Sequence, residues 1–276
     1  MTVDALHGAE YAVRHRHDDV HPVPPGAGQR RATPVGAGPT PIVPADGYGR
    51  RMPLATYKDL CIDASDPHAL SAFWGPLLGW ESHPHDDGDS CLRVGDEVRV
   101  WFNRVPEPKT VKNRLHIDVN AGSLQPALDA GAVVHDEQPR WTVMLDPDGQ
   151  EFCVFVRDKP VTQPFYELVW DVTGDADAAH RLTEWWAEVL GGSAVRDDGF
   201  SHVEGVAGLP FEAVVFQPVP EEKTTKNRIH VDVTALDLGP LVAAGATVTR
   251  RKGDGDIGWT VMLDPAGNEF CAFTPD

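Results

Sequence analysis

The sequence contains little cysteine and little positive charge for its length. Its four cysteines, in 276 residues, form no Cys-x-x-Cys pair, which argues against a disulfide framework and favours reduced thiols in a reducing compartment. Lysine and arginine number 24 against 42 aspartate and glutamate residues, giving a formal net charge of -18. Because nucleic acid and anionic membranes bind basic surfaces, we expect neither as a partner.

Long apolar runs are also missing. No stretch reaches the roughly 18 apolar residues that a membrane-spanning helix needs, and the N-terminus lacks the apolar core of a secretory signal. We therefore expect a cytoplasmic protein. Hydrophobic residues nevertheless make up 41% of the chain, enough to give two domains of ordinary size a core each.

Residues 1–52 differ from the rest of the chain. They are rich in proline and glycine and show no hydrophobic period. Such a segment cannot bury enough apolar surface to offset its chain entropy, which predicts a disordered tail. Met52 directly precedes the first strand-like run, so a gene model that begins too early is an alternative interpretation of equal weight.

From Met52 onward the chain is written twice. The block WTVMLDPDGQEFCVF at 141–155 returns as WTVMLDPAGNEFCAF at 259–273, with 12 of 15 positions identical. EPKTVKNRLHIDV at 107–119 likewise returns as EEKTTKNRIHVDV at 221–233. A repeat this long indicates a duplicated domain rather than a solenoid. We place the two domains at residues 53–160 and 161–276.

Each copy predicts the order strand, helix, three strands, twice over. TYKDLCIDA alternates apolar and polar residues as a half-buried strand does, and DPHALSAFWGPLLG follows with an Asp-Pro start, helical spacing and a closing glycine. Three short strands and then the same series from RLHIDV complete the copy. The aromatic pairs Phe73–Trp74 and Trp185–Trp186 lie on the predicted helices, where we expect them to cover the sheet.

These motifs together resemble the vicinal oxygen chelate superfamily of glyoxalases, bleomycin-resistance proteins and extradiol dioxygenases. The segments AFWGPLLGW, NRLHID and DPAGNEFC are similar to its glyoxalase-like branch. The resemblance implies an α+β fold of four βαβββ modules, forming two tandem glyoxalase-like domains whose curved mixed sheets surround a cavity. It also implies a small-molecule ligand, and either a monomer made by internal duplication or a homodimer.

In that superfamily a divalent metal usually lies in the cavity, bound by residues of the first and last strand of each module. Laid on this pattern, copy one offers Asp59, Arg99, His116 and Cys153, and copy two offers Glu167, Ala213, His230 and Cys271. Only the histidines match the usual ligand type. Arg99 brings a fixed positive charge and Ala213 no donor, so neither position coordinates a cation.

A carboxylate, a histidine and a cysteine remain in each copy: Asp59, His116 and Cys153, and Glu167, His230 and Cys271. Three such ligands with an open position are the arrangement of catalytic zinc, and a thiolate favours Zn²⁺ over Mg²⁺. Glu151 and Glu269 precede the cysteines by two residues and are substitute ligands. The alternative is that no metal binds and that both cysteines are core residues.

Other residues are candidates for contacts with a ligand. His116 and Asp118 share one face of a strand, about 6.6 Å apart along it, as do His230 and Asp232. Arg99, Trp101 and Asn103 alternate inward on another strand, where Ala213, Val215 and Gln217 take their places in copy two, which predicts cavities of different character. Trp141 and Trp259 are either core or cavity wall.

The basic clusters around Lys109 and Lys223 either bind an anionic group or are solvated linkers. The sequence thus leaves two functions open. One is a small-molecule-binding protein with a degenerate metal-ligand set, whose ligand is an oxygenated or anionic metabolite or drug. The other is a lyase or isomerase acting on a carbonyl compound, through a carboxylate-His-Cys metal site or through His116 or His230 as general base.

Overall fold

The computed structural model describes residues 52–255 and 257–275. The predicted tail at residues 1–52 lies outside these ranges except for Met52. Within them the order strand, helix, three strands occurs four times, as predicted. No helix in the described part of the chain is long and apolar enough to cross a membrane.

The four repeats of this order are the modules of the fold. The first contains β1 (Thr56–Ala64), α1 (Pro67–Leu78), β2 (Glu81–Pro84), β3 (Ser90–Val94) and β4 (Glu97–Arg104). The second contains β5 (Leu115–Ala121), α2 (Gln125–Asp129), β6 (Val133–Glu137), β7 (Thr142–Leu145) and β8 (Glu151–Val156). The third contains β9 (Phe165–Thr173), α3 (Ala176–Leu190), β10 (Ser193–Arg196), β11 (Ser201–Glu204) and β12 (Ala213–Val219). The fourth contains β13 (Ile229–Thr234), α4 (Gly239–Ala243), β14 (Thr247–Arg250), β15 (Thr260–Leu263) and β16 (Glu269–Phe273).

The two long helices begin and end where the sequence predicts. The Asp66 side chain accepts a hydrogen bond from the backbone N–H of Ala69 at 3.0 Å and so caps α1, and Asp175 caps α3 in the same way. Gly79 and Gly191 end the helices with φ of 71° and 76°, a left-handed conformation that glycine adopts without steric cost.

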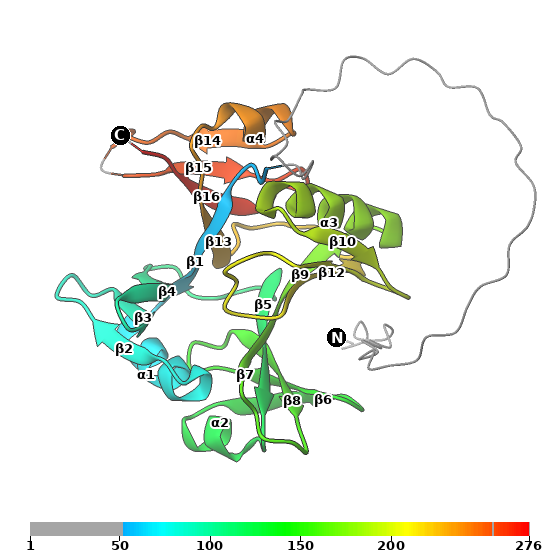
Figure 1. Ribbon diagram of the computed structural model, residues 1–276. Helices are drawn as coiled ribbons and strands as arrows, with labels where there is room; N and C mark the ends of the chain where they lie inside the picture. The colour runs from blue at the N-terminus through cyan, green and yellow to red at the C-terminus, as the bar shows by residue number, and fades with distance from the viewer. Residues whose placement is uncertain (1–51, 256, 276) are drawn as a thin grey trace, which may run out of the picture.

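Each of the two eight-stranded sheets takes half of its strands from each copy. The first sheet has the order β14-β15-β16-β13-β1-β4-β3-β2, and the second has the order β10-β11-β12-β9-β5-β8-β7-β6. β1 pairs with β13 and β5 with β9, both antiparallel, and Figure 1 shows each pair side by side. Both sheets are mixed and open. The boundaries 53–160 and 161–276 stay a prediction for the domains, and the sheets do not follow them.

Alternation along the strands separates a helix-covered face from an inner face. In β4, Val100 and Phe102 are fully buried on the side of α1, whereas Trp101 points to the opposite side and is half-buried. In the second sheet Trp170 packs against Trp186 of α3, with ring centroids 5.8 Å apart. The face opposite the helices is called the inner face below.

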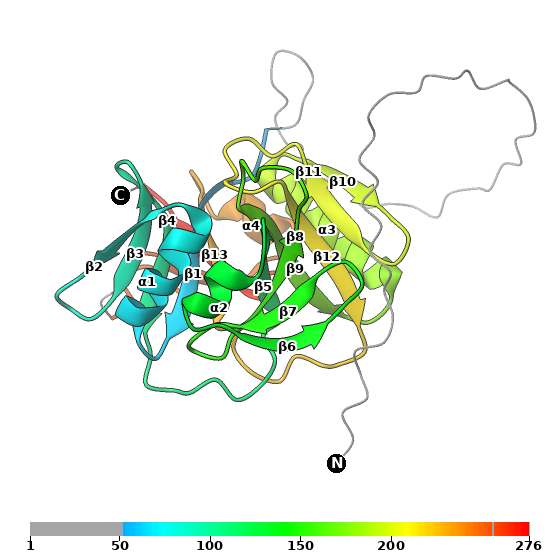
Figure 2. The same cartoon turned by 90° about the horizontal axis from the view of Figure 1, so that it is seen from below.

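The helices join the two modules of one copy, although those modules belong to different sheets. Trp74 of α1 packs edge-on against Phe152 of β8 at 5.0 Å, and Trp186 of α3 packs against Phe270 of β16 at 5.5 Å. In Figure 2 α1 lies beside α2 of the same copy. The predicted covering of the sheets by these aromatic residues is confirmed. The two modules of each copy are therefore joined through hydrophobic packing, whereas the two copies are joined to each other through the shared sheets.

The repeated Asp-Pro-x-Gly segment forms a turn whose aspartate is tied to the same helix. Asp264 is buried; its Oδ1 accepts hydrogen bonds from the backbone of Ala266 and Asn268, both at 2.9 Å, and its Oδ2 accepts one from Trp186 Nε1 at 3.2 Å. Asp146 is bonded in the same way to its own turn and to Trp74. Burial raises the pKa of Asp146 to about 7 and also raises the pKa of Asp264.

We expect Asp264→Ala to lower the free energy of unfolding by about 2–4 kcal/mol, because it leaves two backbone donors and an indole N–H buried without an acceptor. Urea denaturation at neutral pH measures the change. Asp198→Ala, which removes an exposed carboxylate from another turn, is the matched control and is expected to change stability by less than about 0.5 kcal/mol. Equal stabilities of the two variants would show that the buried turn contributes nothing.

Candidate functional site

Strand pairing across the copies assembles a polar cluster on the inner face of the first sheet. The antiparallel register of β1 and β13 places Cys61 opposite His230 and Asp59 opposite Asp232. β16 runs parallel to β13 and places Cys271 beside Asp232. We call these five buried residues site 1.

The second sheet carries the corresponding cluster. β5 and β9 place Asp118 opposite Glu167, and β8 places Cys153 beside Asp118. His116 lies on the same inner face, and its cross-strand neighbour is Val169. Site 2 consists of His116, Asp118, Cys153 and Glu167, all buried.

The grouping of residues by copy is therefore wrong. The sequence pattern joined Asp59 with His116 and Cys153, whereas the structure places Asp59 in site 1 with His230. Glu167, grouped with His230 and Cys271, lies instead in site 2. The physical reason is that the first strand of each copy pairs with the fifth strand of the other copy, so each site takes its two halves from different copies.

The expected pairing of histidine and aspartate on one strand face is present in both sites. His116 Nε2 lies 3.3 Å from Asp118 Oδ1, and His230 Nε2 lies 3.4 Å from Asp232 Oδ1. Cys271 Sγ is 3.4 Å from His230 Nε2. Each imidazole thus has a carboxyl group beside it, an arrangement that orients a histidine.

Two sets of possible metal ligands result within the described residues. In site 1 the ligand atoms of Cys61, His230 and Asp232 all lie within 4.8 Å of one another. In site 2 the same holds for His116, Asp118 and Cys153. Thiolate, imidazole and carboxylate are ligands that divalent zinc accepts, so both sets fit a cation of that type.

Cys61 is a site residue that the sequence pattern does not single out. It follows Asp59 by two positions and therefore points to the same face of β1, which is a signal that could have found it. Copy two has Val169 at the equivalent position, so comparison of the repeats hides it. Asn103 donates a hydrogen bond to the Cys61 sulfur at 2.7 Å, which connects one of the predicted ligand-binding residues to site 1.

Burial governs the protonation of the facing carboxyl groups. Burial first, and then the charge of Asp232, raise the pKa of Asp59 to about 7, although the ammonium group of Lys58 opposes the shift. Burial, followed by the charges of Asp118 and Glu212, raises the pKa of Glu167 to about 8. Near neutral pH Asp59 is therefore partly protonated and Glu167 mostly protonated.

The same causes keep the thiols protonated without a cation. Burial raises the pKa of Cys61, Cys153 and Cys271. The next contribution is the charge of Asp232 for Cys61 and Cys271, and the charge of Asp118 for Cys153. A bound cation would have to displace these protons, so its binding would be pH-dependent.

Other atoms of site 1 have no hydrogen-bond partner among the described residues. They are Asp59 Oδ1, Asp232 Oδ1 and His230 Nδ1, together with the hydroxyl of Tyr57 on β1 next to the site; in site 2 the same is true of Asp118 Oδ1. The Oδ1 atoms of Asp232 and Asp118 have only the ion-pair contacts to histidine Nε2 given above. A buried polar atom without a partner costs about 1–3 kcal/mol, so such a cluster indicates a place for a ligand or an ion.

Glu151 and Glu269, the predicted substitute ligands, are held by the basic clusters. Lys109 Nζ lies 2.7 Å from Glu151, and Lys223 Nζ lies 2.9 Å from Glu269. Lys226 bonds to Asp63 at 2.6 Å. These lysines thus pair with carboxylates at the strand ends, while Lys226 stays half exposed. An anion-binding loop and a solvated linker both stay predictions for the clusters.

The remaining predicted ligand-binding residues divide between the two sites. Trp101 is the β4 neighbour of Cys61 and stands in site 1's wall, while Arg99 lies on the same face and pairs with Glu97. Trp141 packs on Phe155 at 5.8 Å, beside site 2. Trp259 packs on Phe273 at 5.6 Å, beside site 1.

The inner face beside site 2 is more apolar. Val169, Phe200 and Val215 form a small buried cluster of their own there. Ala213 and Val215 stand where site 1 has Arg99 and Trp101, so the predicted difference between the two sites follows from the strands that flank them.

We expect Glu167→Gln to reduce the pH dependence of stability in chelator-treated protein. Folded Glu167 holds its proton more tightly than the unfolded chain, so wild-type stability falls as pH rises from the ordinary glutamate range to about 8. Glutamine does not titrate, so the fall should be smaller. Urea denaturation at pH 5 and pH 8.5 measures it, with the exposed Glu222→Gln as control. Identical pH slopes for both variants would contradict the raised pKa.

Comparison with known proteins agrees with this geometry. The family model of the Glyoxalase-like domain matches residues 59–155 and again residues 171–273. Comparison with curated protein sequences gives no match.

The fold is also that of solved structures. The crystal structure of glyoxalase I from Zea mays is 14% identical with a TM-score of 0.56, over 80% of this chain and 92% of that chain. A point mutant of the same enzyme gives 13% identity and a TM-score of 0.55 over the same shares. At such identity the likeness concerns the fold alone. The two family matches together span more than half of the sequence, and the chain therefore belongs to the glyoxalase-like domain family, with two copies of the domain.

Proposed function

We propose that the protein binds a small oxygenated molecule at site 1 and site 2. The observation that carries this proposal is the pair of facing, buried carboxyl groups in each site, Asp59 with Asp232 and Glu167 with Asp118, each beside a histidine. Titratable groups with strongly raised pKa values cluster at functional sites more often than elsewhere.

The pairs define the ligand chemistry. A carboxyl group that holds a proton donates a hydrogen bond to a carbonyl oxygen, while its ionised partner accepts one from a hydroxyl group. With its raised pKa, Asp59 supplies such a donor in site 1 and Glu167 supplies one in site 2, each facing a second carboxyl group whose oxygens accept hydrogen bonds. A molecule with a carbonyl and a hydroxyl group on neighbouring carbons matches both.

A divalent cation such as Zn²⁺ fits the same residues. Cys61, His230 and Asp232 would hold it in site 1, and His116, Asp118 and Cys153 in site 2. When bound it would supply a positive charge that polarises a ligand oxygen. We keep a cytoplasmic location, and a monomer or homodimer, as further predictions of the sequence.

We expect hydroxyacetone to bind and to shift the NMR signals of residues around both sites. Asp59→Asn and Glu167→Gln keep the shape of the side chain but replace a titratable carboxyl group with an amide that cannot ionise. Each variant should weaken binding at its own site at least tenfold. The exposed Glu222→Gln is the control. Binding that neither variant changes would place the ligand elsewhere and contradict the proposal.

A second function is favoured by one specific observation, the buried His–Asp pairs. A histidine beside a carboxylate is suited to accept a proton from carbon next to a carbonyl group. The candidate activity is that of a lyase or isomerase on a carbonyl compound, with His116 or His230 as general base. Exchange of the carbon-bound protons of hydroxyacetone in D₂O, faster than in buffer and lost in His116→Ala together with His230→Ala, would favour catalysis over binding alone.

The metal is tested separately. We expect the metal-free protein to take up Co²⁺ with the absorption near 350 nm that reports cobalt–thiolate bonds. Cys61→Ser should remove the part due to site 1 and Cys153→Ser the part due to site 2, whereas Cys91→Ser, a buried cysteine outside both sites, should change neither. Absence of this absorption at saturating cobalt would make the cysteines core residues and the sites metal-free pockets.

A further inference from the structure

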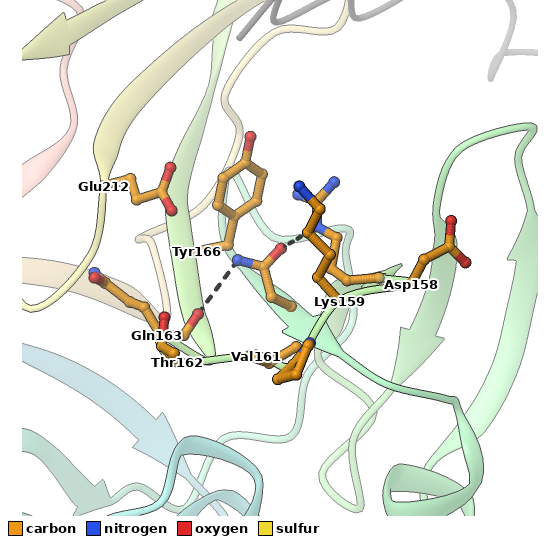
Figure 3. Close-up of a pocket in the computed structure, with 10 residues that line it drawn as sticks. Asp158, Lys159, Val161, Thr162, Gln163, Tyr166 and Glu212 are labelled. Atoms are coloured by element: carbon orange, nitrogen blue, oxygen red, sulfur yellow. Dashed lines mark hydrogen bonds between the residues drawn. The ribbon is translucent and has the colours of Figure 1, made fainter. Parts of the chain in front are cut away.

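A pocket of about 370 Å³ lies beside site 2, where the segment that joins the two copies crosses the end of β8. Its wall combines Arg157, Asn120 and Tyr166 with Lys159 and Gln163 of the joining segment. Figure 3 shows Glu212 and Asp158 on opposite sides of it, with Tyr166 between them. The volume suits a small organic molecule.

Arg157 is held in one orientation by its neighbours. Its Nε donates a hydrogen bond to Asn120 Oδ1 at 2.6 Å, and the Asn120 amide donates to the carbonyl oxygen of Gln163 at 3.2 Å. The guanidinium group lies over the Tyr166 ring at 4.8 Å and over the Phe155 ring at 5.2 Å. These contacts use the Nε side of the fork and its flat face, and the guanidinium group also interacts with the Tyr166 hydroxyl group, so a ligand would bind at the terminal nitrogens beside that hydroxyl group.

The pocket wall carries two cationic and two acidic side chains, and of these four only Arg157 is partly buried. In the described part of the chain no carboxylate lies within ion-pair distance, 4.0 Å, of Arg157 or Lys159. Asp158 and Glu212 are the acidic groups in the wall, and both are exposed to water, which screens their charge. Arg157 is half-buried on two aromatic rings, where a charge is screened less.

The pocket adjoins site 2 through β9. Tyr166 lines the pocket and directly precedes Glu167, and the charges of Glu212 and Arg157 are both close enough to act on Glu167. Glu167 itself does not line the pocket, so a ligand bound there meets this carboxyl group only if it extends past Tyr166.

Site 1 has no counterpart of this arginine. Pro275 follows Phe273 by two positions, as Arg157 follows Phe155. The cations there are Lys58, which lies over Phe273 at 4.3 Å and is already bonded to Asp59 at 2.5 Å, and Arg99 of β4, which pairs with Glu97 at 2.5 Å. The pocket at Arg157 is thus a property of site 2 alone.

We propose that this pocket is an oxyanion subsite of site 2, in which the Arg157 fork, assisted by Lys159, binds a carboxylate or phosphate group of the ligand. The rest of the ligand reaches Glu167, and this part of the inference rests on the proposed function of site 2. The ligand of site 2 is then an anionic hydroxy-carbonyl compound. Site 1 lacks the Arg157 pocket, so this pocket does not select an anionic ligand there.

The test compares matched probes by NMR titration of the full chain. Hydroxypyruvate differs from hydroxyacetone by a carboxylate in place of a methyl group, and dihydroxyacetone phosphate differs from dihydroxyacetone by a phosphate. We expect at least one anionic probe to bind site 2 at least tenfold more tightly than its neutral partner, and the better pair identifies the group. Arg157→Gln should abolish that preference, and Lys159→Gln should reduce it about threefold.

Two controls keep the result interpretable. Arg181→Gln removes an exposed arginine of α3 outside the pocket and should leave the preference unchanged. Lys159 is exposed, so its variant tests the subsite even if Arg157→Gln destabilises the fold. The inference is overturned if neither anion is preferred, or if the preference survives in both Arg157→Gln and Lys159→Gln.

Inorganic phosphate separates the inference from the proposed function. If phosphate shifts the Arg157 Nε–H signal, and hydroxyacetone does not bind in wild type or in Glu167→Gln, the subsite is supported and the proposed function fails. If hydroxyacetone binds and is weakened by Glu167→Gln, while no anion affects Arg157, the proposed function is supported and the subsite fails.

Discussion

The antiparallel pairing of β1 with β13 and of β5 with β9 is the constraint on which both sites depend. Residues directly opposite in such a pair have side chains about 5 Å apart on the same face, so the register decides which groups meet. Here it places Asp59 against Asp232 and Asp118 against Glu167. A shift by one residue would turn these carboxyl groups toward the helices and the apolar residues Leu60 and Leu168 toward the inner face. The burial of the apolar residues on one face of these strands therefore fixes the register, and the register determines which polar residues meet on the other face.

Two kinds of buried carboxyl group result, and their surroundings distinguish them. Asp146 and Asp264 are saturated by backbone and indole donors, which accounts for their place in turns that were kept in both copies. Asp59 and Glu167 face another carboxyl group instead of a set of donors. The first kind stabilises the junction of helix and turn. Asp59 has Lys58 and Glu167 has Tyr166 as a partner, but neither has a full set of donors, so a proton, a cation or a ligand can still bind there. This is why we place function there.

Most of the fold could be predicted from the sequence, because its signals are local. Alternation in TYKDLCIDA, the Asp-Pro start of α1 and the closing Gly79 each act over a few residues, and the repeat shows that the order occurs again. The assembly of the sites could not be predicted in the same way. Whether Asp59 meets His116 or His230 depends on which strands pair over a long separation, and the two arrangements have the same local pattern. Cys61 was missed because comparison of the copies shows only what they share, and Val169 stands at its place in the other copy.

The sharing of sheets has a consequence for how the two sites can differ. One copy by itself holds half of each site, so two separate identical copies would complete them only around a two-fold axis, with both sites the same. In a single chain the symmetry is only approximate, and every position occurs once. Cys61 can then face His230 while Val169 faces His116, and Arg157 can stand at one site while Pro275 stands at the other. Covalent fusion thus gives each site its own sequence, so that one can specialise while the other keeps its chemistry.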